Sequence, residues 1–467
     1  MNGHVLRNVA LCAAVVLVGF SNTSLFAESP YDQWPAGPSS DPGYFPIGVW
    51  AQALRSERIA AYRDAGINLY VGTSWTVTDS GLSLLRNGGM RIILHQDAFT
   101  LSHNWDPVIA GWLMKDEPDN AQKNPSGGWY SPIPPFDDTP WNTNPPEVSS
   151  MYSRYLETRS NDPTRPVFMN LGMGVAYPPY VGRGSRANHP EDYADYVQCT
   201  DIVSYDIYPA ASGNDGIAGK IWLVAEGVDR LVSHARPGQP VWNFVECTDI
   251  HGNGVATPVQ VKAEVWMSII HGSMGILYFV HEFEPFQEPG LLDEPEMLAA
   301  VTDINWQIHE LAPVLNTPTV ADPDLSVSTS NILVPIDWMV KRYNGHTYVF
   351  SLGMRNGSTT GTFTSAAFPP VGIVEVIGED RQIPLSSWSF SDQFDPYEVH
   401  LYRVLSRWPG DADGDGDVDL DDFTRLKVNF GMTSGAEWNQ GDFDHDGDVD
   451  LDDFARLKSN FGVDTTP

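Results

Sequence analysis

Cysteine is scarce in this chain of 467 residues, which contains only three. Cys12 lies in the apolar N-terminal run, so removal of that run leaves Cys199 and Cys247. We expect these two at opposite ends of neighbouring strands, so we do not expect a disulfide between them. A scaffold held together by disulfides is therefore not expected.

Basic residues are also few, with 27 Lys and Arg against 60 Asp and Glu, and the formal net charge is -33. A protein this acidic is repelled by the phosphates of nucleic acids and by anionic membrane surfaces. Nucleic acid is therefore excluded as an expected partner.

Long apolar runs are nearly absent. One run covers residues 10–20, follows Arg7 and leads to small residues that end at Ala27. This pattern predicts a secretory signal peptide over residues 1–27. A membrane anchor is the alternative, but the run is too short and no later stretch could span a bilayer. We expect a secreted, extracellular protein without a transmembrane segment in its mature form.

What the chain has in abundance is aspartate near its end. Residues 411–431 and 442–462 differ at only four positions, and each unit places Asp at alternate loop positions with Gly416 or Gly447 between them. Calcium binds six to eight oxygen ligands in such loops, and this many carboxylates would repel one another without a cation. We therefore predict two structural Ca²⁺ ions. The predicted metal ligands are Asp411, Asp413, Asp415, Asp417, Asp419, Asp422, Asp442, Asp444, Asp446, Asp448, Asp450 and Asp453.

Each loop leads into one helix, and its twelfth position is Asp rather than the Glu of sensor EF-hands. This paired EF-hand-like α module, over 410–467, resembles a type I dockerin. Dockerins are attached to secreted carbohydrate-active enzymes and bind cohesin domains. The resemblance implies a carbohydrate substrate and a cohesin-like or cell-surface partner.

Between residues 44 and 315, short apolar β-rich runs alternate with helical stretches, which predicts an α/β fold of the (β/α)8 TIM-barrel type. The runs are 46–50, 67–75, 90–97, 109–117, 166–171, 201–209, 240–248 and 275–283. A flavodoxin-like sheet is the alternative, but it normally has fewer strands. The third crossover, 98–108, leaves room for barely one helical turn. The Pro- and Gly-rich loop 119–147 follows strand four and is expected to overhang the barrel mouth.

Residues 320–405 change character, because apolar and polar residues alternate there with turn signals between them. Asn344-Gly345 and Asn356-Gly357 are dipeptides typical of hairpins. We predict a small antiparallel β-sandwich.

Two glutamates close barrel strands at the end where barrel enzymes carry their active sites: Glu117 closes strand four and Glu246 closes strand seven. Glycoside hydrolysis needs two carboxyl groups beside the scissile bond. The pair resembles the clan of retaining (β/α)8 glycoside hydrolases, which implies that Glu117 is the acid/base and Glu246 the nucleophile. It also implies carboxyl groups about 5–5.5 Å apart. The chain departs from the clan at Asp116, where the clan usually has Asn. The negative charge of Asp116 is expected to raise the pKa of neighbouring acids.

Other polar and aromatic residues at strand ends suit sugar binding, because rings stack on sugar faces and polar groups bind hydroxyls. The candidate substrate-binding residues are Gln52, Trp75, Asp97, Asp116, Asn170, Tyr205, Asp206, Tyr208 and His281. Tyr205 or Tyr208 is expected to donate a hydrogen bond to the nucleophile and to keep it ionised.

Two alternatives remain open. His95, Asp97, His281 and Glu282 suggest a metal hydrolase, although their spacing is not that of a close metal site. A barrel that binds glycan or assembles at a surface without hydrolysis is the other.

Overall fold

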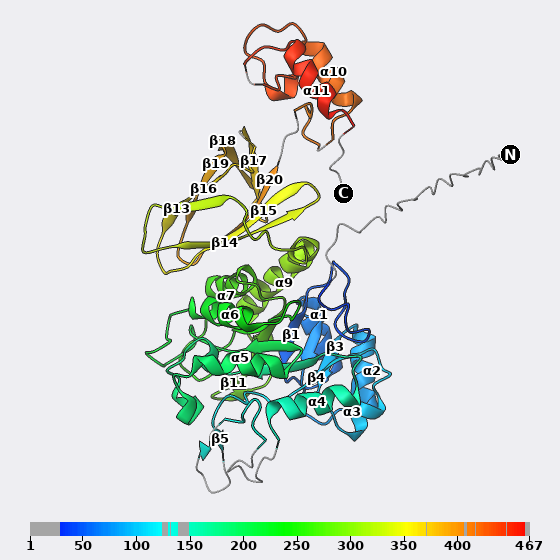
Figure 1. The fold of residues 1–467 in the computed structure, drawn as a ribbon, viewed down its shortest axis with the longest axis vertical. Helices are drawn as coiled ribbons and strands as arrows, with labels where there is room; N and C mark the ends of the chain where they lie inside the picture. The colour runs from blue at the N-terminus through cyan, green and yellow to red at the C-terminus, as the bar shows by residue number, and fades with distance from the viewer. Residues whose placement is uncertain are drawn as a thin grey trace, which may run out of the picture.

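The computed structural model describes residues 29–123, 129–130, 132–138, 149–369, 371–405, 409–415, 417–444 and 446–462. The expected signal peptide and most of loop 119–147 lie outside these ranges. Along the chain follow an α/β barrel, an antiparallel sheet and a small C-terminal module (Figure 1).

Eight parallel strands form the barrel. They are β1 (Ile47–Trp50), β2 (Leu69–Val71), β3 (Arg91–Leu94), β4 (Ile109–Leu113), β7 (Val167–Leu171), β8 (Ile202–Tyr205), β9 (Asn243–Glu246) and β10 (Ile276–Phe279). Their order is β8-β7-β4-β3-β2-β1-β10-β9, and a parallel bridge between Val203 and Val241 closes the ring. Each predicted run contains one of these strands, so the predicted barrel is confirmed.

The barrel strands are connected by helices and two short hairpins. The helices are α1 (Ser56–Asp64), α2 (Asp79–Gly88), α3 (Ala98–Ser102), α4 (Met151–Asn161), α5 (Tyr193–Tyr196), α6 (Leu223–His234), α7 (Pro258–Ile270), α8 (Gly290–Asp293) and α9 (Pro295–Leu315). Short 3₁₀ turns are η1 (Met173–Val175), η2 (Val181–Arg186), η3 (Pro190–Asp192) and η4 (Val197–Cys199). The hairpins pair β5 (Gln122–Lys123) with β6 (Trp129–Tyr130) and β11 (Glu282–Phe283) with β12 (Phe286–Gln287). The third crossover holds only α3, as its length predicted.

Alternate strand residues fill the barrel interior with apolar side chains. They include Leu69, Val71, Ile93, Ala110, Leu113, Phe168, Ile202, Trp242, Phe244 and Leu277. Tyr31 covers the end where the strands begin: its hydroxyl donates to Met274 O at 2.9 Å and accepts from Trp242 Nε1 at 2.9 Å. A functional site therefore has to use the other end, where the strands finish. Cys199 and Cys247 are buried free thiols.

The second domain is one antiparallel sheet of eight strands. They are β13 (Leu325–Thr329), β14 (Ile336–Tyr343), β15 (His346–Gly353), β16 (Thr359–Ser365), β17 (Val371–Val376), β18 (Arg381–Ser386), β19 (Ser389–Phe394) and β20 (Val399–Leu405), in the order β13-β16-β19-β18-β17-β20-β15-β14. Side chains from β14 to β20 meet in a single core, so the sheet curls around its own inner face. The predicted antiparallel β domain is confirmed, and its strands form one curled sheet in which a single residue pair joins β18 to β19. Asn344-Gly345 makes the predicted tight hairpin, whereas Asn356-Gly357 lies between β15 and β16, which are not paired.

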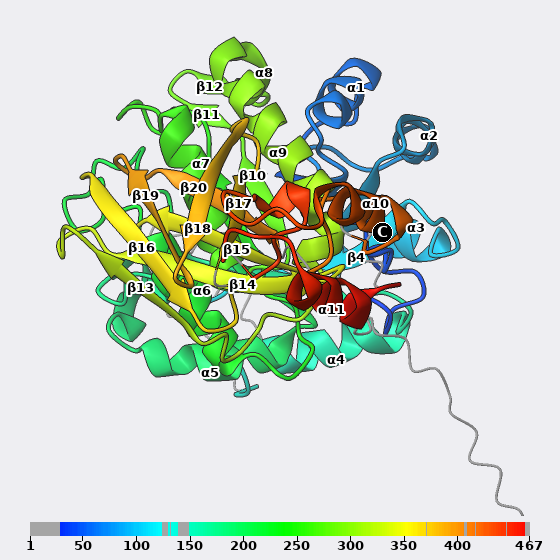
Figure 2. The same cartoon turned by 90° about the horizontal axis from the view of Figure 1, so that it is seen from above.

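The curled sheet rests on the barrel helices α7 and α9 (Figure 2). Trp266 of α7 stacks on Phe350 of β15, with ring centroids 5.6 Å apart and planes 11° apart. Lys341 donates to Leu315 O at 2.9 Å and to Thr317 O at 2.6 Å. The barrel and the sheet therefore share one continuous apolar core.

The C-terminal module contains two helices, α10 (Leu420–Asn429) and α11 (Leu451–Asn460), with the short 3₁₀ turn η5 (Trp438–Gln440) between them. The two repeats pack reciprocally. A Cβ on Gly410 would lie 2.9 Å from the Leu457 Cα, and one on Gly441 would lie 2.8 Å from the Leu426 Cα. Both glycines have positive φ, which favours glycine, and a side chain at either position would also collide with the helix of the other repeat.

The part of the chain that the structure describes contains no helix long and apolar enough to cross a membrane.

One ion-pair cluster ties the curled sheet to the barrel, and it is sensitive to pH. His271, after α7, lies 2.8 Å from Asp229 of α6 and 3.2 Å from Asp337 of β14. Burial lowers the pKa of His271, but the two carboxylates outweigh it and raise that pKa to about 9. The folded pKa exceeds the ordinary value of 6.5, so the stabilisation is complete below about pH 6.5 and is lost as pH rises through about 9.

We expect His271→Gln to reduce the free energy of unfolding by roughly 2 kcal/mol near pH 6. The difference from wild type should shrink toward zero above pH 9, as measured by urea unfolding. His234→Gln, at the end of α6, is the control. A difference that does not change with pH would contradict the assignment.

Candidate functional site

Glu117 lies just after β4 in a backbone conformation that is unusual for a residue with a side chain. Its φ is +43°, its N–H donates to Asn170 O at 3.0 Å and its carbonyl accepts from Asn120 N at 3.1 Å. Positive φ costs such a residue about 1–3 kcal/mol and is concentrated at functional sites. The turn carries the carboxyl group over the end of β7, where a Cβ on Gly172 would lie only 2.8 Å from Glu117 Oε1. Glycine at position 172 therefore leaves the space that this carboxyl group occupies.

The Glu117 carboxyl group and Asp206, which follows β8, lie near enough for the charge of Glu117 to raise the pKa of Asp206. Burial, followed by the charges of Asp116 and Asp119, raises the pKa of Glu117 to about 7. Burial, followed by the charges of Glu117 and Asp116, also raises the pKa of Asp206 well above its ordinary value. The pair therefore retains a proton near neutral pH.

Asp116, which departs from the clan pattern, is held beside this pair. Its Oδ1 accepts from Asn170 Nδ2 at 3.0 Å, and Asn170 Oδ1 accepts from Ser204 Oγ at 2.8 Å. One side of Asp116 faces solvent, but the surrounding protein removes enough water to raise its pKa to about 6. The structure thus brings together Glu117, Asp116, Asn170 and Asp206, four of the predicted site residues.

Asp119 belongs to the same cluster and was missed in the sequence. It is fully buried, accepts from Gly172 N at 2.9 Å and from the Tyr193 hydroxyl at 3.0 Å, and lies 3.9 Å from Arg183 Nε. Its position two residues after Glu117 was the available signal. Asp119 anchors the strand-four turn and adds negative charge beneath Glu117.

Tyr180 was also missed, because it lies in an irregular segment between η1 and η2. Burial, followed by the charges of Glu117 and Asp206, raises the pKa of its hydroxyl. Tyr180 therefore borders the carboxyl pair, and nothing in the sequence pattern marked it.

Glu246 is placed differently from the prediction. Its side chain is fully buried, Oε1 accepts from Ala210 N at 2.6 Å and Oε2 accepts from Ala211 N at 2.5 Å. Its neighbouring acid is the buried Glu264 of α7, and burial raises the pKa of both. The carboxyl partner of Glu117 is thus Asp206, while Glu246 is bound to the segment that follows Asp206 and Tyr208.

The two tyrosines of this segment point in opposite directions. Tyr205 is fully buried against α6 and its hydroxyl donates to Val224 O, so the predicted role of Tyr205 at the mouth does not fit the structure. Tyr208 is half-buried beside Asp206, and its ring lies 5.1 Å from that of Phe279. The strand alternation separates the two residues.

Gln52 and His281 form a buried polar layer at the ends of β1 and β10. Gln52 Oε1 accepts from the Tyr62 hydroxyl at 2.9 Å, and its Nε2 donates to Glu288 O at 2.7 Å and lies 3.3 Å from His281 Nε2. Burial lowers the pKa of His281, so its ring is neutral at physiological pH. With Gln52 fully enclosed, only His281 keeps some exposure.

Asp97 and Trp75 lie on other loops of the same face. Asp97 Oδ1 accepts from Thr100 N at 2.7 Å and caps α3, which gives it a structural task. Trp75 is 68% exposed and lines a cavity of about 300 Å³ with Leu54, Arg55 and Thr78.

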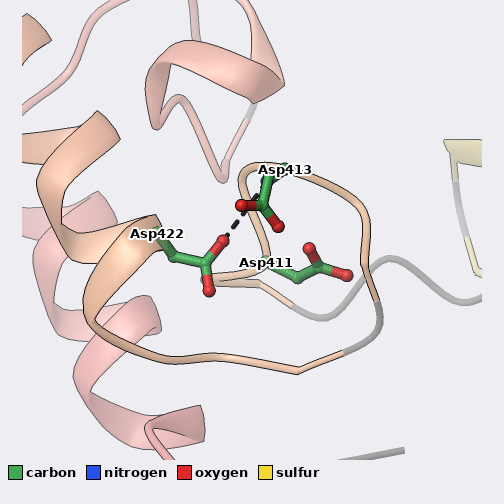
Figure 3. Close-up of side chains that lie close together, drawn as sticks. All are labelled: Asp411, Asp413 and Asp422. Atoms are coloured by element: carbon green, nitrogen blue, oxygen red, sulfur yellow. Dashed lines mark hydrogen bonds between the residues drawn. The ribbon is translucent and has the colours of Figure 1, made fainter. Parts of the chain in front are cut away.

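Two overlapping carboxylate groups form in each aspartate-rich loop. Asp411, Asp413 and Asp422 form one group in the first loop (Figure 3), and Asp417 and Asp419 join Asp422 in the other. In the second loop the corresponding groups are Asp442 with Asp444 and Asp453, and Asp448 with Asp450 and Asp453. Within each group the oxygens lie within 4.8 Å of one another. Asp415 and Asp446 lie outside these groups.

The donor set of the loops fits calcium. All donors are carboxylate oxygens, which suit this hard cation, and Asp448 Oδ1 is buried without a hydrogen-bond partner in the described structure. Partial burial, followed by Asp415 and Asp422, raises the pKa of Asp413, and a bound cation would offset that repulsion. Among the described residues, all groups that could hold a metal lie in this module. His95 and His281 of the metal-hydrolase alternative belong to none of them.

Comparisons with known proteins give weak likenesses. No protein-family profile and no curated protein matches the chain. An α-amylase from Geobacillus thermoleovorans, complexed with acarbose, is 9% identical with a TM-score of 0.45, covering 78% of this chain and 98% of that one. The GH42 β-galactosidase Gan42B from G. stearothermophilus is 8% identical with a TM-score of 0.47, covering 80% and 100%. A GH30 endoxylanase from Clostridium papyrosolvens is 10% identical with a TM-score of 0.37, covering 77% and 95%. Likeness at this level says nothing about the chemistry of the chain.

The buried pair of Glu246 and Glu264 predicts a dependence of stability on pH. Both folded pKa values lie above the ordinary 4.5, and that of Glu246 is about 7. The stabilisation is therefore complete below about pH 4.5 and is lost as pH rises through about 7 and beyond. The free energy of unfolding of Glu264→Gln should fall less with rising pH than that of wild type. At pH 8 it should be larger than the wild-type value by at least about 1.4 kcal/mol.

Denaturant unfolding between pH 5 and 9 measures this difference, with the exposed Glu226→Gln of α6 as control. Parallel pH profiles for wild type and Glu264→Gln would show that Glu264 does not have a raised pKa in the folded protein.

Proposed function

We propose that the chain is a secreted glycoside hydrolase that cleaves O-glycosidic bonds of a poly- or oligosaccharide at the barrel mouth. The observation that supports this most strongly is Glu117, a carboxyl group with a pKa of about 7 at the end of barrel strand four. A general acid works best when its pKa lies near the working pH, and glycoside cleavage begins with protonation of the leaving oxygen. Burial, together with the charges of Asp116 and Asp119, raises the pKa of Glu117 to that value.

In this proposal Glu117 donates its proton to the glycosidic oxygen. Asp206, whose pKa is raised by burial and by the charge of Glu117, keeps a proton in the pair between turnovers. Asn170 and Asp116 offer polar groups to sugar hydroxyls beside it. Tyr208 and Tyr180 lie near enough to the pair for its charges, after burial, to raise the pKa of both hydroxyls.

The second carboxyl group decides between mechanisms. Burial and the charge of Glu117 raise the pKa of Asp206 well above its ordinary value, so Asp206 does not supply the ionised carboxylate that a retaining nucleophile needs. The retaining mechanism that the resemblance implies needs Glu246 as nucleophile. That role requires the backbone of Ala210 and Ala211 to release its carboxylate when substrate binds.

The enclosure of Glu246 favours a second candidate function, a barrel that binds glycan or assembles at a surface without hydrolysing it. In that case the carboxyl cluster binds sugar hydroxyls, and Glu246 only holds the 206–211 segment. The two functions differ in turnover.

Hydrolysis of a panel of aryl glycosides and polysaccharides by wild type separates the two functions. Glu117→Gln should lower kcat/KM by about 10²–10⁴-fold, the usual value of general acid catalysis. Asp116→Asn removes a charge that raises the pKa of Glu117, so the alkaline limb of the pH profile should move to lower pH. Azide should rescue Glu246→Ala and give a glycosyl azide if Glu246 is the nucleophile.

Binding of glycan without turnover in wild type would reject the hydrolase in favour of the non-catalytic barrel. Full activity in Glu117→Gln would reject the assigned acid.

For the C-terminal module we propose two structural Ca²⁺ ions and, through the dockerin-like resemblance, attachment to a cohesin-like or cell-surface partner. Asp411, Asp413 and Asp422 would hold one ion, and Asp442, Asp444 and Asp453 the other. Each ion would neutralise carboxylates between a loop and the start of its helix.

Calorimetric titration of the calcium-free full-length chain should show two ions per chain. Asp422→Asn should remove one ion and Asp422→Asn with Asp453→Asn both. The exposed Asp421→Asn, outside the carboxylate groups, should keep two. At a calcium concentration a hundred times Kd, each bound ion should stabilise the module by about 2.7 kcal/mol, seen as resistance to proteolysis after residue 410. No binding, or two ions in the double variant, would contradict the site.

A further inference from the structure

A series of aromatic rings leads from the carboxyl pair to the surface. The proposed role of Glu117 as an acid assigns no task to these rings. The ring of Tyr208, beside Asp206, lies 5.1 Å from that of Phe279. Phe279 lies 6.0 Å from Phe283, and Phe283 stacks on Phe286 at 6.2 Å with planes 29° apart. The rings form a continuous series with its inner end at the acidic cluster.

The outer end of this series is exposed, although it is built rigidly. Phe283 and Phe286 are 45% and 65% exposed and face each other across the β11–β12 pair. Phe283 N donates to Ile250 O at 3.1 Å, and His251 stacks on the Phe283 ring at 5.6 Å with planes 19° apart. Because backbone pairing and stacking fix these rings, the exposed part of each ring can contact a ligand with little loss of side-chain entropy.

Most of the charged groups near these rings are acidic, and Arg58, a cation that acts on the neighbouring His281, is paired with Glu288. Asp249, Asp293 and Glu294 act on Glu282, the neighbour of Phe283 in β11. The carboxyl cluster at the inner end is acidic as well. An anionic ligand would be repelled along the whole path, whereas a neutral ligand with an apolar face would not.

We propose that Phe283 and Phe286 form a subsite that stacks on the pyranose rings of a neutral polysaccharide whose scissile bond lies at Glu117. The proposal rests on the proposed function for the position of that bond. It adds the substrate class, a chain of uncharged sugars, and excludes uronic-acid polymers. Sugar rings bind aromatic faces through their C–H groups, and the line of rings suits several successive sugars.

The test is calorimetric binding of neutral hexasaccharides of glucose, xylose and mannose, and of oligogalacturonate, to the full-length chain. All variants carry Glu117→Gln, so that substrate is not consumed. Phe283→Ala and Phe286→Ala should each weaken binding of the preferred neutral hexasaccharide about tenfold, which equals about 1.4 kcal/mol. Phe283→Trp should restore the affinity. Phe461→Ala removes a ring of similar exposure, 51%, from the C-terminal module and should change nothing.

Unchanged affinity in both alanine variants, absence of binding by every neutral hexasaccharide, or tighter binding of oligogalacturonate would overturn the subsite. Turnover by the wild-type chain is measured separately. Weakened binding in the variants with no hydrolysis by wild type would uphold the subsite and reject the hydrolase. Hydrolysis by wild type with unchanged affinities in the alanine variants would support the hydrolase and reject the subsite.

Discussion

Crowding of carboxyl groups at one end of the barrel is the constraint around which the candidate site is built. Glu117, Asp116, Asp119 and Asp206 lie together in protein that removes water from them, and four charges cannot all persist there. The structure accommodates them because the raised pKa values of Glu117 and Asp206 keep a proton on that pair, and because Asp119 pairs with Arg183. A weak acid near neutral pH is the result.

The supporting residues hold this arrangement from several strands. Gly172 leaves room for Glu117, and Asn170 ties Asp116 to Ser204 of β8. The buried Glu246 accepts hydrogen bonds from the backbone of Ala210 and Ala211, which follow Tyr208. The position of Asp206 therefore depends on a residue at the end of another strand. The same segment starts the aromatic series toward Phe283. The same segment thus positions the partner of the proposed acid Glu117 and the inner end of the proposed sugar-binding rings.

Strand ends were predictable from the sequence, and side-chain environments were not. Eight apolar runs of strand length located the barrel and placed Glu117 at its mouth. Whether Glu246 faces the mouth depends on the segment 206–211 folding over it, which no periodicity reveals. Tyr205 and Tyr208 have similar sequence surroundings, yet one packs on α6 and the other borders the site. The second domain shows the same limit, because alternation in its strands is identical for two packed sheets and for one sheet that curls.

The central claim is that the Glu117–Asp206 pair carries a proton at neutral pH. Infrared difference spectra of wild type against the Glu117→Gln, Asp206→Asn double variant isolate the protonated carboxyl band of this pair across a pH titration. The band should persist at pH 6 and begin to disappear near pH 7, where Glu117 titrates. A band already absent at pH 5 would show that both groups are ionised, which would contradict the retained proton and the proposed acid.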